Sequence, residues 1–500
     1  MTRHRGVQLL LGGVLIGIGL AVAVFRYWPG PARGAYTSEP PVQDFALLDH
    51  RGRHHQLYRY RSAGAVVLYT HGVGCPAVRN SLAALKALRD RYSGDGVRFL
   101  LINANPQDDR AALAADAERL GIDLPILKDE AQLVAESLGV TRTGEAILID
   151  TRDWQVRYRG PVDDWVERGA QRPRAGRAYL DEAITALLAG EAIATPRVAS
   201  PGCLIHIAER GPTPSYAAQV APILGARCAG CHRTGGVAPW AMDSHARIQG
   251  WSAMMREAIM TRRMPPWGAD DSAGALSPNL ALGTDEQRIL VHWLAAGAPR
   301  GDGPDPFATQ PSTAEPEWPL GTPDRIIDLP AQSIPASGLI PYRWIRIDAA
   351  LDREHWVRAA QLKPSNPAAM HHGFVFVQYP AAAARNQPVW DEGRNGFFAA
   401  HVPGFDVLEL PPDSGQLIPA GAKLVFQLHY IAQGQAGNDR PRLGLYFHER
   451  PPKLEYRVES ASNMRIRIPP WTAGHEEHAS TVVTEALTLH AFYPHMHYRG

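Results

Sequence analysis

The sequence predicts a multidomain protein that combines an N-terminal apolar segment, an α/β domain, a mostly helical module and an all-β sandwich. Three observations lead to this prediction. The chain has 500 residues, which corresponds to roughly three ordinary domains. Proline-rich stretches at 192–214 and 300–322 divide it. The apolar pattern changes at each stretch, from alternating strand-like and helical runs, to helical spacing, to short β-like runs.

Composition and charge limit the possible functions. The 51 basic and 50 acidic residues nearly balance and form no basic stripe, so no nucleic-acid partner is expected. The 46 glycines and 42 prolines favour β-rich domains and long connections. With only four cysteines, the chain is not a disulfide scaffold.

Residues 1–30 predict a signal anchor. Arg3 and Arg5 precede an apolar run at 7–25, which is typical of a secretory signal or a signal anchor. The run is long enough to span a bilayer, and the preceding positive charges direct the rest of the chain across it. We expect a periplasmic protein tethered to the inner membrane, or a secreted one if the anchor is cleaved.

Residues 41–190 predict an α/β domain. Strand-like runs at 65–70, 97–103 and 146–150 alternate with helical patterns at 81–92 and 111–120. This alternation is typical of an α/β sheet. Gly74-Cys75-Pro76 stands between the first strand and the first helix, and this order of elements resembles the thioredoxin/redoxin superfamily. The resemblance implies a thioredoxin-like fold with Cys75 at a helix N-terminus, where the helix dipole favours the thiolate.

Three positions depart from that family's pattern. Val78 stands where the second cysteine of C-x-x-C would be, Gly72 stands where peroxiredoxins carry threonine, and Gly144 replaces the proline of the cis-proline loop after Thr143. Two hypotheses remain open. In the first, the domain is a one-cysteine thiol reductase or peroxidase that uses Cys75, with Cys203 as a possible resolving or disulfide partner. In the second, the fold is retained for docking or structure.

Residues 215–300 contain Cys228-Ala-Gly-Cys231-His232. The C-x-x-C-H pattern is the attachment site of c-type haem, with both thiols bound covalently and the histidine on the iron. A zinc site would need two further ligands at suitable spacing, and Cys203 is the only cysteine left nearby. Since haem c is attached outside the cytoplasm, this motif agrees with the predicted export.

A haem iron that carries electrons usually has a second axial ligand, and methionine raises its potential. Met264 precedes two prolines that would stiffen such a loop. Similar Met-Pro-Pro stretches occur in class I-like bacterial cytochromes c, which this segment resembles, so we expect Met264 to be the ligand. Trp240 and Trp267 are predicted to pack on the porphyrin. The other methionine candidates are Met242, Met254, Met255 and Met260.

The β-like region from 319 onward carries three histidine groups: His371-His372, His429, and His495-Met-His497. Alternate residues of a strand share a face, so an H-x-H pair can bind one metal ion. An adjacent pair can share an ion only where the strand is bent. Imidazole-rich sites without thiolates suit copper, and also zinc or iron.

These groups resemble the copper type II, ascorbate-dependent monooxygenases, the family of peptidylglycine and dopamine monooxygenases. The resemblance covers 319–500 and implies a jelly-roll β-sandwich at 319–455 and the start of a second sandwich at 456–500. It assigns His371, His372 and His429 to a copper ion that stores and delivers an electron. It assigns His495 and His497 to a second copper ion that binds oxygen and hydroxylates a nearby C–H bond.

The second copper site lacks a ligand. In the family a methionine well downstream of the H-x-H completes it, whereas this sequence has three residues after His497. We expect either a cut form of a longer protein or an incomplete site. Met496 faces away from its neighbours, and His490 is a weak substitute. Other nearby histidines are expected to be structural or exposed: His401, His475 and His478.

The leading hypothesis is a copper-dependent monooxygenase that uses molecular oxygen, an organic substrate and electrons delivered through haem c. The complete protein would bind two copper ions and accept electrons from a periplasmic donor. One alternative is a non-catalytic electron-transfer or copper-binding protein. The other is a thiol redox enzyme that uses Cys75. The sequence does not indicate the substrate.

Overall fold

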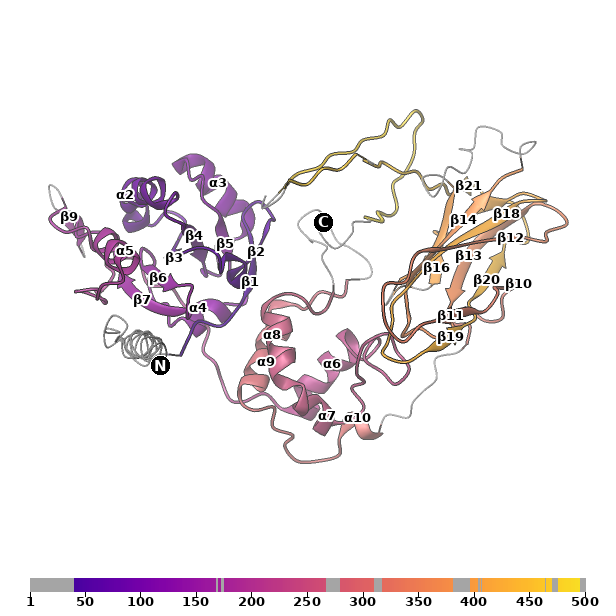
Figure 1. Cartoon of the computed structure of the whole chain (residues 1–500), viewed down its shortest axis with the longest axis horizontal. Helices are drawn as coiled ribbons and strands as arrows, with labels where there is room; N and C mark the ends of the chain where they lie inside the picture. Colours follow the sequence, from indigo (N-terminus) through magenta and orange to yellow (C-terminus); the bar gives the residue numbers. More distant parts are fainter. Residues whose placement is uncertain are drawn as a thin grey trace, which may run out of the picture. The chain divides into compact units, whose positions relative to one another are not determined.

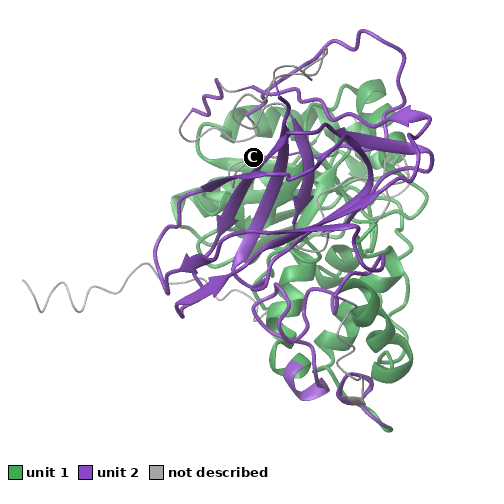
Figure 2. Ribbon diagram, turned by 90° about the vertical axis from the view of Figure 1, so that its right-hand side faces the viewer, with its two compact units in different colours: residues 1–227, 248–303 green, residues 228–247, 304–500 purple. Residues whose placement is uncertain are grey.

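The computed structural model describes residues 40–167, 170–171, 175–266, 279–309, 317–380, 396–402, 405, 407–463, 465–469 and 475–494. The chain forms two compact units (Figure 2): Met1–Arg227 with Ile248–Gly303, and Cys228–Arg247 with Pro304–Gly500. The predicted anchor at 1–30 lies outside the described residues. Within those residues, no helix has the length and apolar character needed to cross a membrane.

The first unit contains a seven-stranded sheet in the order β2-β1-β5-β4-β3-β6-β7 (Figure 1). β3 pairs in parallel with β4 and antiparallel with β6. Every residue of β3 is buried, as expected for a strand covered on both faces. The strands are β1 (Ala46–Asp49), β2 (His54–Gln56), β3 (Ala65–Thr70), β4 (Val97–Asn103), β5 (Ile126–Lys128), β6 (Ala146–Asp150) and β7 (Gln155–Gly160). A separate short pair joins β8 (Val166–Glu167) and β9 (Ala170–Gln171).

Alternate residues of β3 face two different cores. Val67 packs with Leu85 and Ile184 in one core, whereas Val66 packs with Val134 in the other. This alternation follows from the two-residue period of a strand. The helices around the sheet are η1 (Leu57–Tyr60), α2 (Pro76–Tyr92), α3 (Arg110–Leu120), α4 (Leu133–Ser137) and α5 (Tyr179–Ala189). The predicted α/β sheet is therefore confirmed.

Residues 196–208, which we call the Cys203 arm, pack onto this α/β domain although they were predicted to lie in a linker. Arg197 forms a parallel bridge with Arg159, and Leu204 forms an antiparallel bridge with Arg142. The Ile205 N–H donates to the Thr141 carbonyl oxygen at 2.9 Å. The arm is therefore fixed by backbone pairing, which its proline content did not indicate.

Residues 215–300, predicted to be a helical module, are helical with turns where the structure describes them, and one short helix follows at Pro306–Thr309. In the first unit, Trp293 of α9 is fully buried and stacks on Tyr216 at 5.6 Å between ring centroids. Arg288 of α9 donates to the carbonyl oxygens of Ala131 and Ala208 at 2.8 and 3.1 Å, which ties α9 to the α/β domain. The helices are η2 (Tyr216–Val220), α6 (Ala221–Arg227), α7 (His245–Gly250), α8 (Ser252–Met260), α9 (Thr284–Ala295) and α10 (Pro306–Thr309).

The second unit is rich in β-sheet, as predicted. One sheet has the order β10-β20-β13-β17-β21 with β16 beside β13, and another has the order β12-β18-β14-β15. Side chains from both sheets, such as Leu362 and Phe426, share one core. The strands are β10 (Arg325–Asp328), β11 (Gln332–Ile334), β12 (Arg343–Asp348), β13 (His355–Lys363), β14 (Met370–Gln378), β15 (Phe397–His401), β16 (Val407–Glu409), β17 (Ser414–Ile418), β18 (Lys423–Tyr430), β19 (Gly437–Asp439), β20 (Arg442–Phe447) and β21 (Leu454–Glu455). The described residues after Glu455 form no helix or strand, so the strands expected at 456–500 do not appear there.

Candidate functional site

Cys75 lies where β3 leads into α2. It is the N-cap residue of α2, with Pro76 at the first helical position, where a fixed φ suits the start of a helix. Gly74 adopts φ +71°, a conformation that glycine reaches without strain. The Val78 N–H donates to the Cys75 sulfur. The strand–turn–helix therefore places the thiol at the positive end of a helix, as the sequence predicted.

Cys203 lies directly opposite Cys75. The two sulfur atoms are 2.8 Å apart although the residues are separated by 128 positions. Cys75 is 5% exposed, whereas Cys203 is exposed to solvent. The structure thus brings together two of the cysteines that the sequence proposed as partners.

Thr143 joins the two cysteines. Its Oγ1 lies 3.0 Å from the Cys75 sulfur and accepts the Cys203 N–H at 2.9 Å. The Thr143 N–H in turn donates to the Cys203 carbonyl oxygen at 2.9 Å. The sequence singled out Thr143 only as the residue before the missing proline, because its contacts depend on chain segments far away in sequence.

Gly202 allows the arm to approach this closely. A Cβ atom at Gly202 would lie 1.7 Å from the Thr143 carbonyl oxygen, far inside van der Waals contact. Arg142 donates to the Gly202 carbonyl oxygen at 2.7 Å. Glycine at 202 is therefore required for the contact between the two thiols.

The surroundings give the two thiols different acidities. Burial acts to raise the pKa of Cys75, but hydrogen bonds from Cys203, Thr143 and the Val78 N–H outweigh it and hold the pKa below the ordinary cysteine value. Burial and the neighbouring Cys75 raise the pKa of Cys203. Because thiolate is the reactive form, Cys75 is suited to attack first and Cys203 to respond.

A buried polar network supports the loop before Cys75. One oxygen of Asp108 accepts the Val73 N–H at 3.0 Å and the side-chain amides of Asn103 and Asn105 at 2.7 and 3.0 Å. Buried Lys128 donates to the Asn105 carbonyl oxygen at 2.6 Å. These bonds fix the loop backbone from the side of β4 and β5.

The predicted haem motif forms a compact turn. The His232 N–H donates to the Cys228 carbonyl oxygen at 2.9 Å, and His232 Nδ1 lies 3.1 Å from the Trp240 carbonyl oxygen. With Nδ1 donating to that carbonyl, Nε2 is the nitrogen that can bind iron. Burial lowers the pKa of His232, which favours the neutral, ligating form. His232 can therefore present Nε2 to a haem iron, and attachment of haem c at Cys228 and Cys231 stays a prediction.

The second haem ligand stays a prediction. Met264 is 42% exposed and belongs to the first unit, whereas His232 belongs to the second. Met242 is buried, and its N–H donates to the His232 carbonyl oxygen at 2.7 Å. Trp267 lies outside the described residues.

His371, His372 and His429 form a cluster on β14 and β18. One ring nitrogen from each lies within 4.8 Å of the others. His372 pairs across the sheet with His429, and the register shifts between Met370 and His372. That irregularity lets adjacent histidines turn toward one point, as the sequence required. Three imidazoles suit copper, and also zinc or iron.

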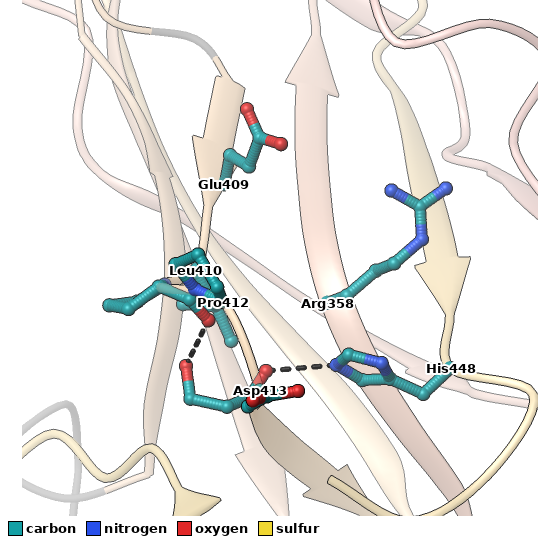
Figure 3. Close-up of a pocket in the computed structure, with 8 residues that line it drawn as sticks. Arg358, Glu409, Leu410, Pro412, Asp413 and His448 are labelled. Atoms are coloured by element: carbon teal, nitrogen blue, oxygen red, sulfur yellow. Dashed lines mark hydrogen bonds between the residues drawn. The ribbon is translucent and has the colours of Figure 1, made fainter.

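His495 and His497, assigned to a second copper ion, lie outside the described residues. A hollow of about 510 Å³ in the second unit (Figure 3) contains no residue that the sequence predicted to be functional. His448 at its edge contacts the Ser414 carbonyl oxygen at 2.9 Å. The hollow is lined by Arg358, Glu409, Leu410, Pro411, Pro412, Asp413, Ser414 and His448.

The sheet, the cysteine at the start of α2 and the facing thiol define a thioredoxin-like redoxin domain. Comparison with known proteins agrees, since residues 39–160 match the AhpC/TSA family. The chain is 32% identical over 146 residues to "Thiol-disulfide oxidoreductase ResA" of Geobacillus thermodenitrificans (strain NG80-2), covering 29% of this chain and 79% of the relative. Through this N-terminal domain, the chain belongs to the AhpC/TSA family.

Solved structures similar to this chain also cover about a third of it. A hypothetical protein of Sinorhizobium meliloti 1021 is 29% identical and covers 34% of this chain and 95% of its own, with a TM-score of 0.30. An uncharacterized conserved protein of Geobacillus kaustophilus is 30% identical and covers 34% and 90%, with a TM-score of 0.30. Peroxidoxin BcpB of Mycobacterium tuberculosis is 23% identical and covers 30% and 94%, with a TM-score of 0.24.

Proposed function

We propose that the redoxin domain catalyses thiol–disulfide exchange, with Cys75 as the nucleophile and Cys203 as the resolving thiol. The 2.8 Å contact between the two sulfur atoms carries this proposal. The name of the Geobacillus thermodenitrificans relative, a thiol-disulfide oxidoreductase, supports it. Of the sequence hypotheses, a thiol redox enzyme is therefore favoured over a fold kept for docking.

The exchange follows from the acidities of the two thiols. The Cys75 thiolate attacks one sulfur of a substrate disulfide, forms a mixed disulfide and releases the other substrate sulfur as a thiolate. Cys203 then loses its proton and attacks the Cys75 sulfur, which releases the second substrate thiolate. The substrate disulfide is reduced by two electrons, and the domain is left with a Cys75–Cys203 disulfide. An external dithiol would restore the two thiols.

A peroxide is the alternative oxidant for the same pair. Attack of Cys75 on a peroxide would give a sulfenic acid, which Cys203 would resolve to the same disulfide with loss of water. Gly72 replaces the threonine that peroxiredoxins carry, so we favour disulfide substrates. The rate at which the Cys75–Cys203 disulfide forms, measured with glutathione disulfide and with hydrogen peroxide, distinguishes a disulfide substrate from a peroxide.

The test uses the full chain, reduced and then exposed to glutathione disulfide, with peptide mass spectrometry as the readout. We expect a Cys75–Cys203 linkage in the wild type, no adduct at position 75 in Cys75→Ser, and a persistent glutathione adduct on Cys75 in Cys203→Ser. A Cys228→Ser, Cys231→Ser double variant is the control and should behave as wild type. Unchanged substrate reduction by Cys75→Ser would refute the proposal.

We also propose that the chain binds copper at His371, His372 and His429, because their ring nitrogens converge within 4.8 Å. Haem c would be held by Cys228, Cys231 and His232, with Met264 as the expected second ligand. Together these groups would supply one-electron redox chemistry. Oxygen-dependent hydroxylation of an organic substrate would also need the copper site of His495 and His497, and without it the region would be a non-catalytic electron-transfer or copper-binding module.

The location and partners of this module follow as part of the same proposal. Covalent haem attachment requires export, so the protein would lie in the periplasm, held at the inner membrane by residues 1–30 and fed by a periplasmic electron donor. Haem staining of the denatured chain tests covalent attachment and should disappear in the Cys228→Ser, Cys231→Ser double variant. Metal analysis should give two copper ions for the hydroxylase and one for the electron-transfer alternative, while a chain without copper would refute both.

A further inference from the structure

We propose that Thr143 is a positioning residue that sets the reactivity of the Cys75 sulfur and delivers Cys203 to it, using space that Gly72 leaves open. The inference rests on the proposed thiol exchange, and it assigns a role to a residue of the loop before β6. Contacts with both cysteines and with Gly72 carry it.

The hydroxyl of Thr143 has one proton and two acceptor lone pairs. One lone pair accepts the Cys203 N–H at 2.9 Å. The Cys203 carbonyl oxygen is 3.5 Å away, whereas the Cys75 sulfur is 3.0 Å away. The hydroxyl proton is therefore directed to the Cys75 sulfur, where it favours the thiolate. The accepted N–H polarises the hydroxyl and strengthens that bond.

The position of Thr143 depends on the absence of a side chain at residue 72. A Cβ atom on Gly72 would lie 2.7 Å from the Thr143 methyl carbon, which is closer than real contacts allow. The space beside Cys75 that a side chain at 72 would enter is thus filled by Thr143. The hydroxyl near the nucleophile comes from the loop before β6 and not from the turn that precedes the cysteine.

Few other groups can tune this sulfur. Cys203 is the ionisable neighbour on the arm, and its own pKa is raised by burial and by Cys75. Tyr69 of β3 is buried, which raises the pKa of its phenol and keeps it neutral. The remaining contacts are the backbone N–H groups of Val78, at the start of α2, and of Cys203. A change at Thr143 should therefore be visible in the acidity of Cys75.

The experiment measures alkylation of the Cys75 peptide by iodoacetamide against pH, using mass spectrometry on the full chain in a Cys203→Ser background. Thr143→Val keeps the shape but removes the hydroxyl, and it should move the midpoint upward by about one pH unit, since hydrogen bonds to charged groups are the strong ones. Thr143→Ser keeps the hydroxyl and should stay near the parent. Thr185→Val, which removes the α5 hydroxyl that contacts the Tyr92 hydroxyl of α2, is the matched control and should leave the midpoint unchanged.

The outcomes separate this inference from the proposed function. An unchanged midpoint in Thr143→Val, or an equal shift in Thr143→Ser, would overturn the role of the hydroxyl. In chains that retain Cys203, Thr143→Val should also slow closure of the Cys75–Cys203 disulfide, and Thr143→Ser should restore it. If Thr143→Val shifts the midpoint but the wild type never forms the Cys75–Cys203 disulfide, the role of Thr143 is supported and the exchange is refuted. Thermal unfolding of each variant shows whether the domain stays folded.

Discussion

Substitution of Gly202 by alanine should separate Cys203, the proposed resolving thiol, from Cys75. The new Cβ would lie 1.7 Å from the Thr143 carbonyl oxygen and 2.9 Å from its hydroxyl oxygen. An ordinary carbon–oxygen contact is roughly 3.3 Å, so the arm must retreat by about 1.5 Å. The obstacle is backbone, which cannot rotate away as a side-chain tip would. The arm itself must therefore move.

The retreat breaks specific bonds. The Cys203 N–H to Thr143 Oγ1 bond and the Thr143 N–H to Cys203 carbonyl bond are both 2.9 Å in length, and each contributes about 1 kcal/mol. A loss of about 2 kcal/mol corresponds to roughly thirtyfold in the population of the closed arrangement. Displacements of this size in a reacting pair cost about a hundredfold in rate. We expect disulfide closure to slow by between about 30-fold and 100-fold.

Rapid-quench alkylation after mixing with glutathione disulfide measures that closure. The mixed disulfide on Cys75 should form within a few-fold of the wild-type rate and then persist in Gly202→Ala. Gly94→Ala is the matched control, because a Cβ atom there meets nothing within 4 Å. Closure at the wild-type rate in Gly202→Ala would refute the argument that the close approach of this backbone positions Cys203.

Three further predictions follow from contacts elsewhere. Gly72→Ala places a methyl group 2.7 Å from the Thr143 methyl carbon, so Cys75 exchange should slow several-fold in stopped-flow assays, whereas wild-type rates would show that the loop yields. The hydrogen bond from His71 lowers the pKa of buried Asp116, so its stabilisation is complete above the ordinary aspartate range and is lost as pH falls through the depressed native value. The free energy of unfolding, measured with urea at several acidic pH values, should therefore fall less steeply with decreasing pH in Asp116→Asn than in the wild type. An equally steep fall would contradict this. By metal analysis, His372→Ala should bind one copper ion fewer per chain than the wild type, whereas His475→Ala, an exposed control, should bind as many as the wild type; equal copper in both would exclude the cluster as the site.

The α/β domain could be predicted where burial alone determines the structure. The runs at Ala65–Thr70, Val97–Asn103 and Ala146–Asp150 became β3, β4 and β6 with those bounds, because strands covered on both faces are continuously apolar. The start of α2 was placed too late, at residue 81, because Pro76 was not used as a helix-initiating signal. The short strands β2 and β5 have three residues each, too few for a period to be recognised.

The candidate site was predictable in its residue types but not in its geometry. Cys75 was located by the order strand, turn and helix, and the histidine cluster by its spacing. The contact between Thr143 and Cys203 was not recognisable, because it depends on backbone approach between segments 60 residues apart. Gly202 lies in a stretch whose prolines indicated a linker. In a sequence, a glycine that permits close backbone approach cannot be distinguished from a glycine in a flexible linker.

The 2.8 Å contact between the two thiols needs an explanation other than proximity in sequence. In a C-x-x-C motif the helix turn holds both cysteines together, whereas here 128 residues separate them. The arm is held by bonds that involve neither sulfur: Gln132 donates to the His206 carbonyl oxygen and accepts the Ala208 N–H, and Ile205 pairs with Thr141. Folding, and not disulfide formation, therefore offsets the entropy lost when the chain between Cys75 and Cys203 closes into a loop. The arm keeps Cys203 beside Cys75 before any oxidation, so resolution in the proposed exchange would be an intramolecular step despite the missing second cysteine at Val78.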